Sequence, residues 1–140
     1  MSEDKLWDFI VGLDDDLLKG GVIESEYTGA LIRSADLAFV GEAWLACIIT
    51  SIAVVESYLR SESKEKKQRL VDLIDSSGLG ADLISELHEL RRYRNSWVHV
   101  SDPWNDDSVE YTEENERRLE EMARRCLIAM RKTVYSNQWI

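Results

Sequence analysis

Apolar residues recur at helical spacing along nearly the whole chain, and no stretch shows the sustained two-residue alternation of a half-buried strand. The sequence contains a single proline, Pro103, so few positions interrupt the hydrogen bonding of a helical backbone. With 140 residues, of which 44% are hydrophobic, the chain suits one domain that buries most of its apolar surface. We therefore predict an all-α fold, a single compact bundle of five to six helices formed by residues 1–140.

The apolar spacing predicts six helices of unequal length. The third is apolar on most of its sides, so it needs neighbouring helices on several faces. In the second helix, we expect the inward stripe to consist of Tyr27, Leu31, Ser34 and Ala38. The expected ranges are about 4–19, 25–41, 42–60, 70–77 and 81–98, followed by a last helix with Thr112 as its N-cap.

The charge and the hydropathy of the chain bear on its partners and its location. A formal net charge of −10 argues against a general nucleic-acid binder, which would carry a basic balance. The N-terminal segment is acidic, unlike the basic start of a signal peptide. The longest apolar run, 43–55, is shorter than the roughly 20 residues that span a bilayer. We therefore expect a cytoplasmic protein with no membrane partner.

The cysteines and histidines do not form a metal-binding pattern. Cys47 and Cys126 lie far apart in apolar helical stretches, without Cys-x-x-Cys spacing, and we expect both to be buried. His88 and His99 are separated by about 16 Å if the segment is helical, which is too far to share a metal ion. The sequence therefore predicts neither a bound metal nor a cofactor.

One part of the predicted fifth helix carries polar residues suited to chemistry. An ideal helix turns by about 100° per residue, which places Arg94 within an otherwise apolar stripe. A buried arginine is costly unless it meets a carboxylate, a partner chain or a bound anion. A second, cationic stripe contains His88, Arg92, Asn95 and His99. On an arbitrary helix such a stripe is more often a solvated face, but here an arginine on the core side and an Asn/His pair on its flank occur within six residues, which favours a functional site.

The run from Glu89 to His99, ELRRYRNSWVH, resembles the Arg-x(4–6)-His motif of HEPN domains, in which a polar residue, often asparagine, follows the arginine. The apolar stretch 43–59, with Glu56 near its end, resembles the family helix that packs beside the motif helix. The resemblance implies a helical bundle that dimerises, so that the motifs of two chains face each other across one cleft. It also implies an activity, because many members of the family cleave RNA without a metal ion.

The resemblance implies roles for three residues of the motif. RNA supplies its own nucleophile, the 2′-hydroxyl, so the protein needs a group that moves protons and a fixed cation beside the scissile phosphate. His99 suits the first task and Arg94 the second, while Asn95 orients the phosphate or the histidine. Residues five apart on an ideal helix point about 140° away from each other. Either the helix ends or bends near Trp97, or the site combines residues of two chains.

The candidate supporting or RNA-binding residues are Glu56, His88, Arg91 and Arg92. We expect Glu56 to pair with Arg91 or Arg94, or else to reach solvent at its helix end. The leading hypothesis is a homodimeric endoribonuclease in a toxin or defence role, with an antitoxin or another operon product as partner. The alternatives are a HEPN-like module that binds a nucleotide, RNA or a protein without catalysis, which the acidic charge favours, and a purely structural protein.

Overall fold

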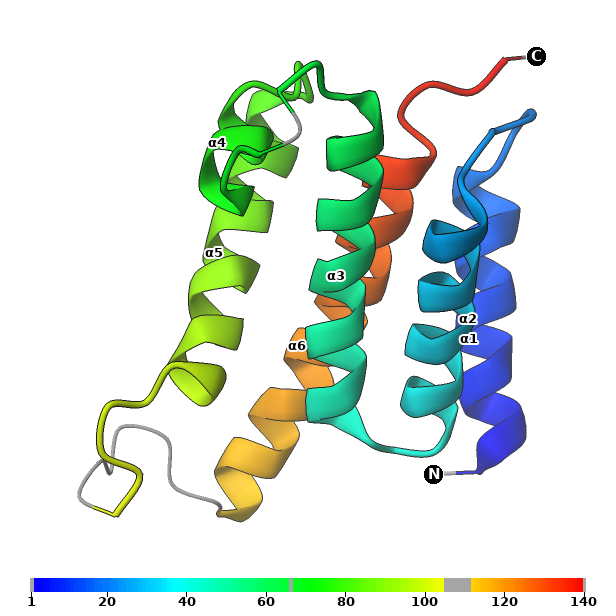
Figure 1. Ribbon diagram of the computed structural model, residues 1–140. Coiled ribbons are helices and arrows are strands. Elements are labelled where there is room, and N and C mark those ends of the chain that lie inside the picture. Colours follow the sequence, from blue (N-terminus) through cyan, green and yellow to red (C-terminus); the bar gives the residue numbers. More distant parts are fainter. Residues whose placement is uncertain (1, 66, 105–111, 140) are drawn as a thin grey trace.

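The computed structural model describes residues 2–65, 67–104 and 112–139, and it confirms the predicted all-α fold class (Figure 1). Within these residues the regular structure is helical apart from one isolated backbone bridge. The helices form a compact arrangement and are α1 (Glu3–Leu17), α2 (Glu26–Val40), α3 (Trp44–Glu62), α4 (Leu70–Asp75), α5 (Ala81–Val98) and α6 (Glu113–Val134).

The arrangement of the helices centres on α3 and α6 (Figure 1). α3 packs against α2 and α6, and α1 packs against α2 and α6. α5 lies on the other side of the bundle, against α6 and α3, with the short α4 beside its first turns. The C-terminal end of α5 lies at the same end of the bundle as the beginnings of α3 and α6 (Figure 1).

α3 is the core helix that its sequence predicts. Its buried side chains include Trp44, Ile48, Ile52, Val55 and Leu59, which follow one another at helical spacing. By length and composition it is also the one helix among the described residues that meets the criterion for a membrane span, although half of the qualifying window is buried inside the protein. Packing on several neighbours therefore accounts for much of its apolar character.

The buried stripe of α2 differs from the prediction. Tyr27, expected to face inward, is 82% exposed, and the buried stripe runs through Thr28 and Phe39 instead. The Phe39 ring lies between those of Phe9 and Trp44, with centroid distances of 5.4 and 5.3 Å. α2 is thus rotated by one residue from the expected orientation, because burial of this large ring outweighs burial of the smaller Ala38.

A buried arginine connects three helices. Arg131 of α6 is 1% exposed, and its guanidinium forms ion pairs with Asp14 of α1 and Asp36 of α2, at 2.9 and 2.7 Å. The Tyr135 hydroxyl donates to the same oxygen of Asp14 at 2.7 Å. Burial raises the pKa of Asp36, and its bonding to Arg131 opposes this shift. Charge as well as apolar packing therefore joins α1, α2 and α6.

The segment after α6 pairs with the loop between α1 and α2. The backbone groups of Gly21 and Trp139 exchange two hydrogen bonds, at 2.7 and 3.0 Å. The Gln138 side chain accepts hydrogen bonds from the amides of Lys19 and Gly20, at 2.6 and 2.8 Å. A Cβ atom at position 21 would lie 2.8 Å from the Trp139 ring, so a larger residue here would displace this exposed ring from its present position.

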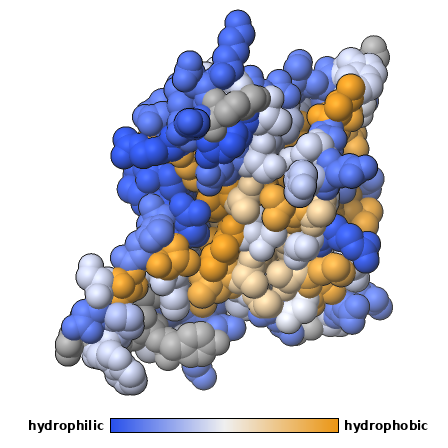
Figure 2. Space-filling model, viewed as in Figure 1, coloured by the Kyte–Doolittle hydropathy of each residue, from blue (hydrophilic) through white to orange (hydrophobic). Residues whose placement is uncertain are grey.

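Figure 2 shows that one face of the molecule is divided by polarity. Apolar surface covers much of α3 and α2, and hydrophilic surface covers α4 and the upper part of α5. Exposed apolar residues of α2 and α3 include Leu37, at 46% exposure, and Ile49, at 36%. Val98, in the last turn of α5, is also exposed. Contiguous apolar surface of this kind is typical of an interaction face.

Candidate functional site

The predicted motif occupies the last turn of α5 and the residue that follows it. α5 ends at Val98, and His99 leaves helical geometry with φ −117° and ψ 46°. The amide of His99 still donates to the carbonyl of Asn95 at 3.0 Å. β-Branched Val98 and Val100 disfavour further helix, and Pro103 follows closely. Of the two alternatives for the motif, the structure therefore shows the first, in which the helix ends near Trp97.

Arg94 is half-buried, and its neighbour in the sequence holds its side chain. The Arg94 Nε donates to Oδ1 of Asn95 at 2.9 Å, and Asn95 is the hydrogen-bond partner that the described residues provide for this guanidinium. Burial lowers the pKa of Arg94, the carboxylate of Glu56 opposes the shift, and the nearby charge of Arg91 adds to it. The Arg94 guanidinium is therefore a cation held in one position, with few hydrogen-bond acceptors around it.

Glu56 does not form the predicted ion pair. Its Oε2 accepts a hydrogen bond from Nη2 of Arg60, one turn later on α3, at 2.6 Å. Arg60 also donates to the backbone carbonyl of Gln68 at 2.9 Å. The expected direct pairing with Arg91 or Arg94 is wrong, because a partner four residues along the same helix satisfies the carboxylate locally. Glu56 acts on Arg94 through space alone.

His88 connects α4 to the motif helix. Its Nε2 lies 2.7 Å from Oδ1 of Asp75, in the last turn of α4, and its Nδ1 lies 3.5 Å from Nη2 of Arg91. Because an arginine can only donate hydrogen bonds, Nδ1 is the acceptor in the contact with Arg91, and Nε2 donates to the Asp75 carboxylate. The Nε of Arg91 is buried and has no hydrogen-bond partner among the described residues. Asp75 was not among the predicted site residues, because its place at the end of a short helix is its one distinguishing sequence feature.

The remaining predicted site residues are exposed. Arg92 lies near Glu89, whose pKa is lowered chiefly by its hydrogen bond to Arg125 and, to a smaller extent, by Arg92. The structure therefore does not bring Arg92 to Arg94. The imidazole of His99 is exposed, and no described residue forms a hydrogen bond with it. Within one chain, the structure joins Arg94 to Asn95 and Arg91 to His88.

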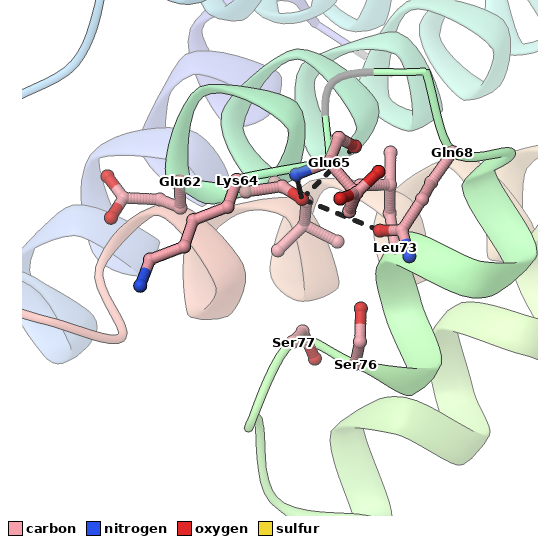
Figure 3. Close-up of a pocket in the computed structure, with 9 residues that line it drawn as sticks. Glu62, Lys64, Glu65, Gln68, Leu73, Ser76 and Ser77 are labelled. Carbon is pink, nitrogen blue, oxygen red and sulfur yellow. Dashed lines mark hydrogen bonds between the residues drawn. The ribbon is translucent and has the colours of Figure 1, made fainter.

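Two of the pockets in the described part of the chain bear on the motif and on α4. The first, of about 300 Å³, adjoins the motif at Trp97 and is otherwise lined by Glu42, Ala43, Trp44, Leu45, Ala46, Glu116 and Leu119. The second, of about 310 Å³, lies between the end of α3 and α4 (Figure 3). There the Ser63 hydroxyl bonds to Glu65 and Gln68 of its own loop, and the Lys64 side chain extends away from Ser76 and Ser77. No predicted site residue lines the second pocket.

The cysteines are free and buried, as predicted. Burial raises the pKa of the Cys47 thiol to about 12, and burial also raises the pKa of Cys126. Both thiols are therefore protonated near neutral pH and are poor nucleophiles. In the part of the chain that the structure describes, no three histidine, cysteine, aspartate or glutamate side chains are grouped closely enough to hold a metal ion.

Comparisons with known proteins provide no relative for this chain, since no family model, no curated protein and no solved structure matches it. The resemblance to HEPN domains therefore rests on the motif from Arg94 to His99 and on the order of the helices around it.

Proposed function

We propose that the protein is a HEPN-type endoribonuclease that cleaves RNA without a metal ion, with Arg94, Asn95 and His99 as its catalytic residues. One observation carries the proposal. The half-buried guanidinium of Arg94 is fixed by Asn95 in the last turn of α5, directly before the exposed imidazole of His99. A guanidinium with few acceptors is suited to phosphate oxygens, and an exposed imidazole can exchange protons with a substrate.

The proposed reaction begins with the substrate. The 2′-hydroxyl loses its proton to His99, and its oxygen attacks the adjacent phosphorus atom. Arg94 stabilises the negative charge that develops on the non-bridging oxygens. The bond from phosphorus to the 5′-oxygen breaks, and the leaving oxygen takes a proton from solvent. The products are a 2′,3′-cyclic phosphate and a 5′-hydroxyl end.

A homodimer is part of the proposal. The apolar surface over α2 and α3, together with exposed Val98 at the end of α5, offers a face that a second copy can cover (Figure 2). A two-fold contact through this face and α5 would set two motifs against each other, so that Arg94 of one chain and His99 of its partner serve one site. Following the resemblance, we place the enzyme in the cytoplasm, in a toxin or defence role with an operon-encoded antitoxin.

The test is an RNA-cleavage assay in EDTA with purified wild type and single variants. Arg94→Ala and His99→Ala should each lose activity by on the order of a hundredfold or more, because each removes a group that acts in the transition state. Arg69→Ala is the control, since it removes an arginine that is not among the candidate site residues and whose side chain is 81% exposed. Cleavage that persists in both Arg94→Ala and His99→Ala would refute the assignment.

A second candidate function is a HEPN-like module that binds RNA, a nucleotide or a protein in the same place without catalysis. The net charge of −10 favours it, because affinity for RNA depends largely on neutralised phosphates. The two functions differ in one measurement. A binding module retains RNA on the protein and leaves it intact, whereas the proposed enzyme converts it to cyclic-phosphate ends.

A further inference from the structure

A second arginine of α5 lies close to Arg94. Arg91 precedes it by three residues, so the two side chains leave the helix within about 60° of each other. Both residues are half-buried, and the charge of Arg91 contributes to the lowered pKa of Arg94. The two guanidinium groups therefore lie within electrostatic reach of each other.

The surroundings of Arg91 provide little compensation for its charge. Its Nε is buried without a partner among the described residues, and its Nη2 meets His88 Nδ1 at the long distance of 3.5 Å. The nearby carboxylates are engaged elsewhere, since Glu56 bonds to Arg60 and Asp75 reaches Arg91 only through His88. A buried donor without an acceptor, beside a second cation, is costly unless an anion completes the group.

We propose that Arg91 is a second phosphate-binding residue, which holds the RNA backbone phosphate adjacent to the one at Arg94. The inference rests on the proposed function, because it takes Arg94 to mark the scissile phosphate. Neither arginine forms a direct ion pair with a described residue, so the two place positive charge together in a chain whose net charge is −10. The site therefore takes an oligonucleotide with consecutive phosphates in preference to a mononucleotide.

His88 and Asp75 are positioning residues for Arg91. The Asp75 carboxylate holds the Nε2 proton of His88, so the lone pair of Nδ1 faces the Arg91 guanidinium. His88 is largely buried, with 16% of its side chain exposed, which restricts the orientation of its ring. The pair acts through Arg91 and does not itself touch the substrate.

The first experiment compares two arginines with the same charge. Binding of a short 2′-O-methyl RNA, which lacks the attacking hydroxyl, is measured by fluorescence anisotropy for wild type, Arg91→Gln and Arg69→Gln. We expect Arg91→Gln to weaken binding by about tenfold or more, because charge-assisted hydrogen bonds to phosphate are lost. Arg69→Gln should have a much smaller effect, because the Arg69 side chain is 81% exposed at the start of α4. Equal losses in the two variants, or no binding by the wild type, would overturn the subsite.

The second experiment tests the positioning role. Asp75→Ala should weaken binding, although removal of a nearby negative charge would by itself strengthen the binding of a phosphate. Asp75→Asn should restore affinity, because the amide oxygen can still accept the Nε2 proton of His88. Asp72→Ala is the control, since it removes another acidic group of α4 that pairs with Arg69. Affinity in Asp75→Asn as low as in Asp75→Ala would refute positioning by His88.

Kinetics separate this subsite from the proposed activity. On cleavable RNA, Arg91→Gln should raise KM with kcat little changed, whereas Arg94→Gln should lower kcat. A wild type that binds 2′-O-methyl RNA through Arg91 but leaves RNA intact refutes the endoribonuclease and keeps the subsite. A wild type that cleaves RNA, with Arg91→Gln and Arg69→Gln indistinguishable in both binding and KM, refutes the subsite and keeps the enzyme.

Discussion

Removing the charge of Arg131 should destabilise the fold more than any surface substitution. Arg131→Met keeps the length of the side chain and leaves Asp14 and Asp36 without their cation. The Asp14 side chain is 39% exposed and can regain solvent, but Asp36 is only 14% exposed, so most of the loss arises there. Loss of one partner of a buried ion pair costs about 3–5 kcal/mol. For a chain of this size, the melting temperature should fall by roughly 10–20 °C.

The size of this loss should depend on pH in a defined direction. In the wild type, burial raises the pKa of Asp36 while Arg131 opposes the rise. Arg131→Met removes the opposing interaction, so the pKa of Asp36 in the folded variant rises further. A carboxyl group whose pKa is raised on folding favours the folded state at low pH, and this contribution is lost as the pH rises through the folded pKa. The difference between wild type and variant should therefore grow from acidic to neutral pH.

Urea denaturation followed by circular dichroism measures both effects. The double variant Arg131→Met/Asp36→Leu is the control, because replacing the whole buried pair by apolar groups should recover much of the lost stability. A loss below about 1 kcal/mol for Arg131→Met, as for an exposed ion pair, would refute the reasoning. An equal loss at acidic and neutral pH would refute the assignment of the penalty to Asp36.

Three further predictions follow from the site and the surface. RNA products should carry 2′,3′-cyclic phosphate and 5′-hydroxyl ends, which mass spectrometry identifies. Products with 5′-phosphate ends that appear only with magnesium would contradict the mechanism. Ile49→Glu should convert the homodimer into a monomer, as measured by light scattering. Val11→Glu, which adds the same charge to α1, should leave the dimer intact. A monomeric wild type would contradict a site formed by two chains. Cys47 and Cys126 should react with a thiol reagent only after unfolding, and rapid labelling of the native protein would contradict their burial.

The fold could be predicted to the extent that local chemistry determines it. The range of α5 and the N-cap of α6 follow from the sequence, and the Thr112 hydroxyl accepts the amide of Asn115 at 3.1 Å as a capping residue does. The inward stripe of α2 does not follow in this way. Its orientation depends on Phe9 and Trp44, which belong to other helices, so the spacing within α2 could not reveal that Phe39 is buried in place of Tyr27.

The candidate site was predictable where it lies within one segment. Arg94, Asn95 and the end of α5 are neighbours in the sequence, and their contacts follow from helical geometry and a nearby proline. The partners from other helices were not predictable. Glu56 bonds to Arg60 instead of an arginine of α5. Asp75 contacts His88 from α4, and the apolar pattern predicts that helix but not how it packs against α5.

The backbone bridge between Gly21 and Trp139 can be used to follow the last stage of folding. The two residues lie near opposite ends of the sequence, and closing so long a loop has an entropic cost that local helix formation does not have. The bridge should therefore form after α1, α2 and α6 have packed. Trp44 is buried in the core, so its fluorescence should change when the helices pack. Trp139 contacts Gly21 only after the two distant segments have joined, so its fluorescence should change later.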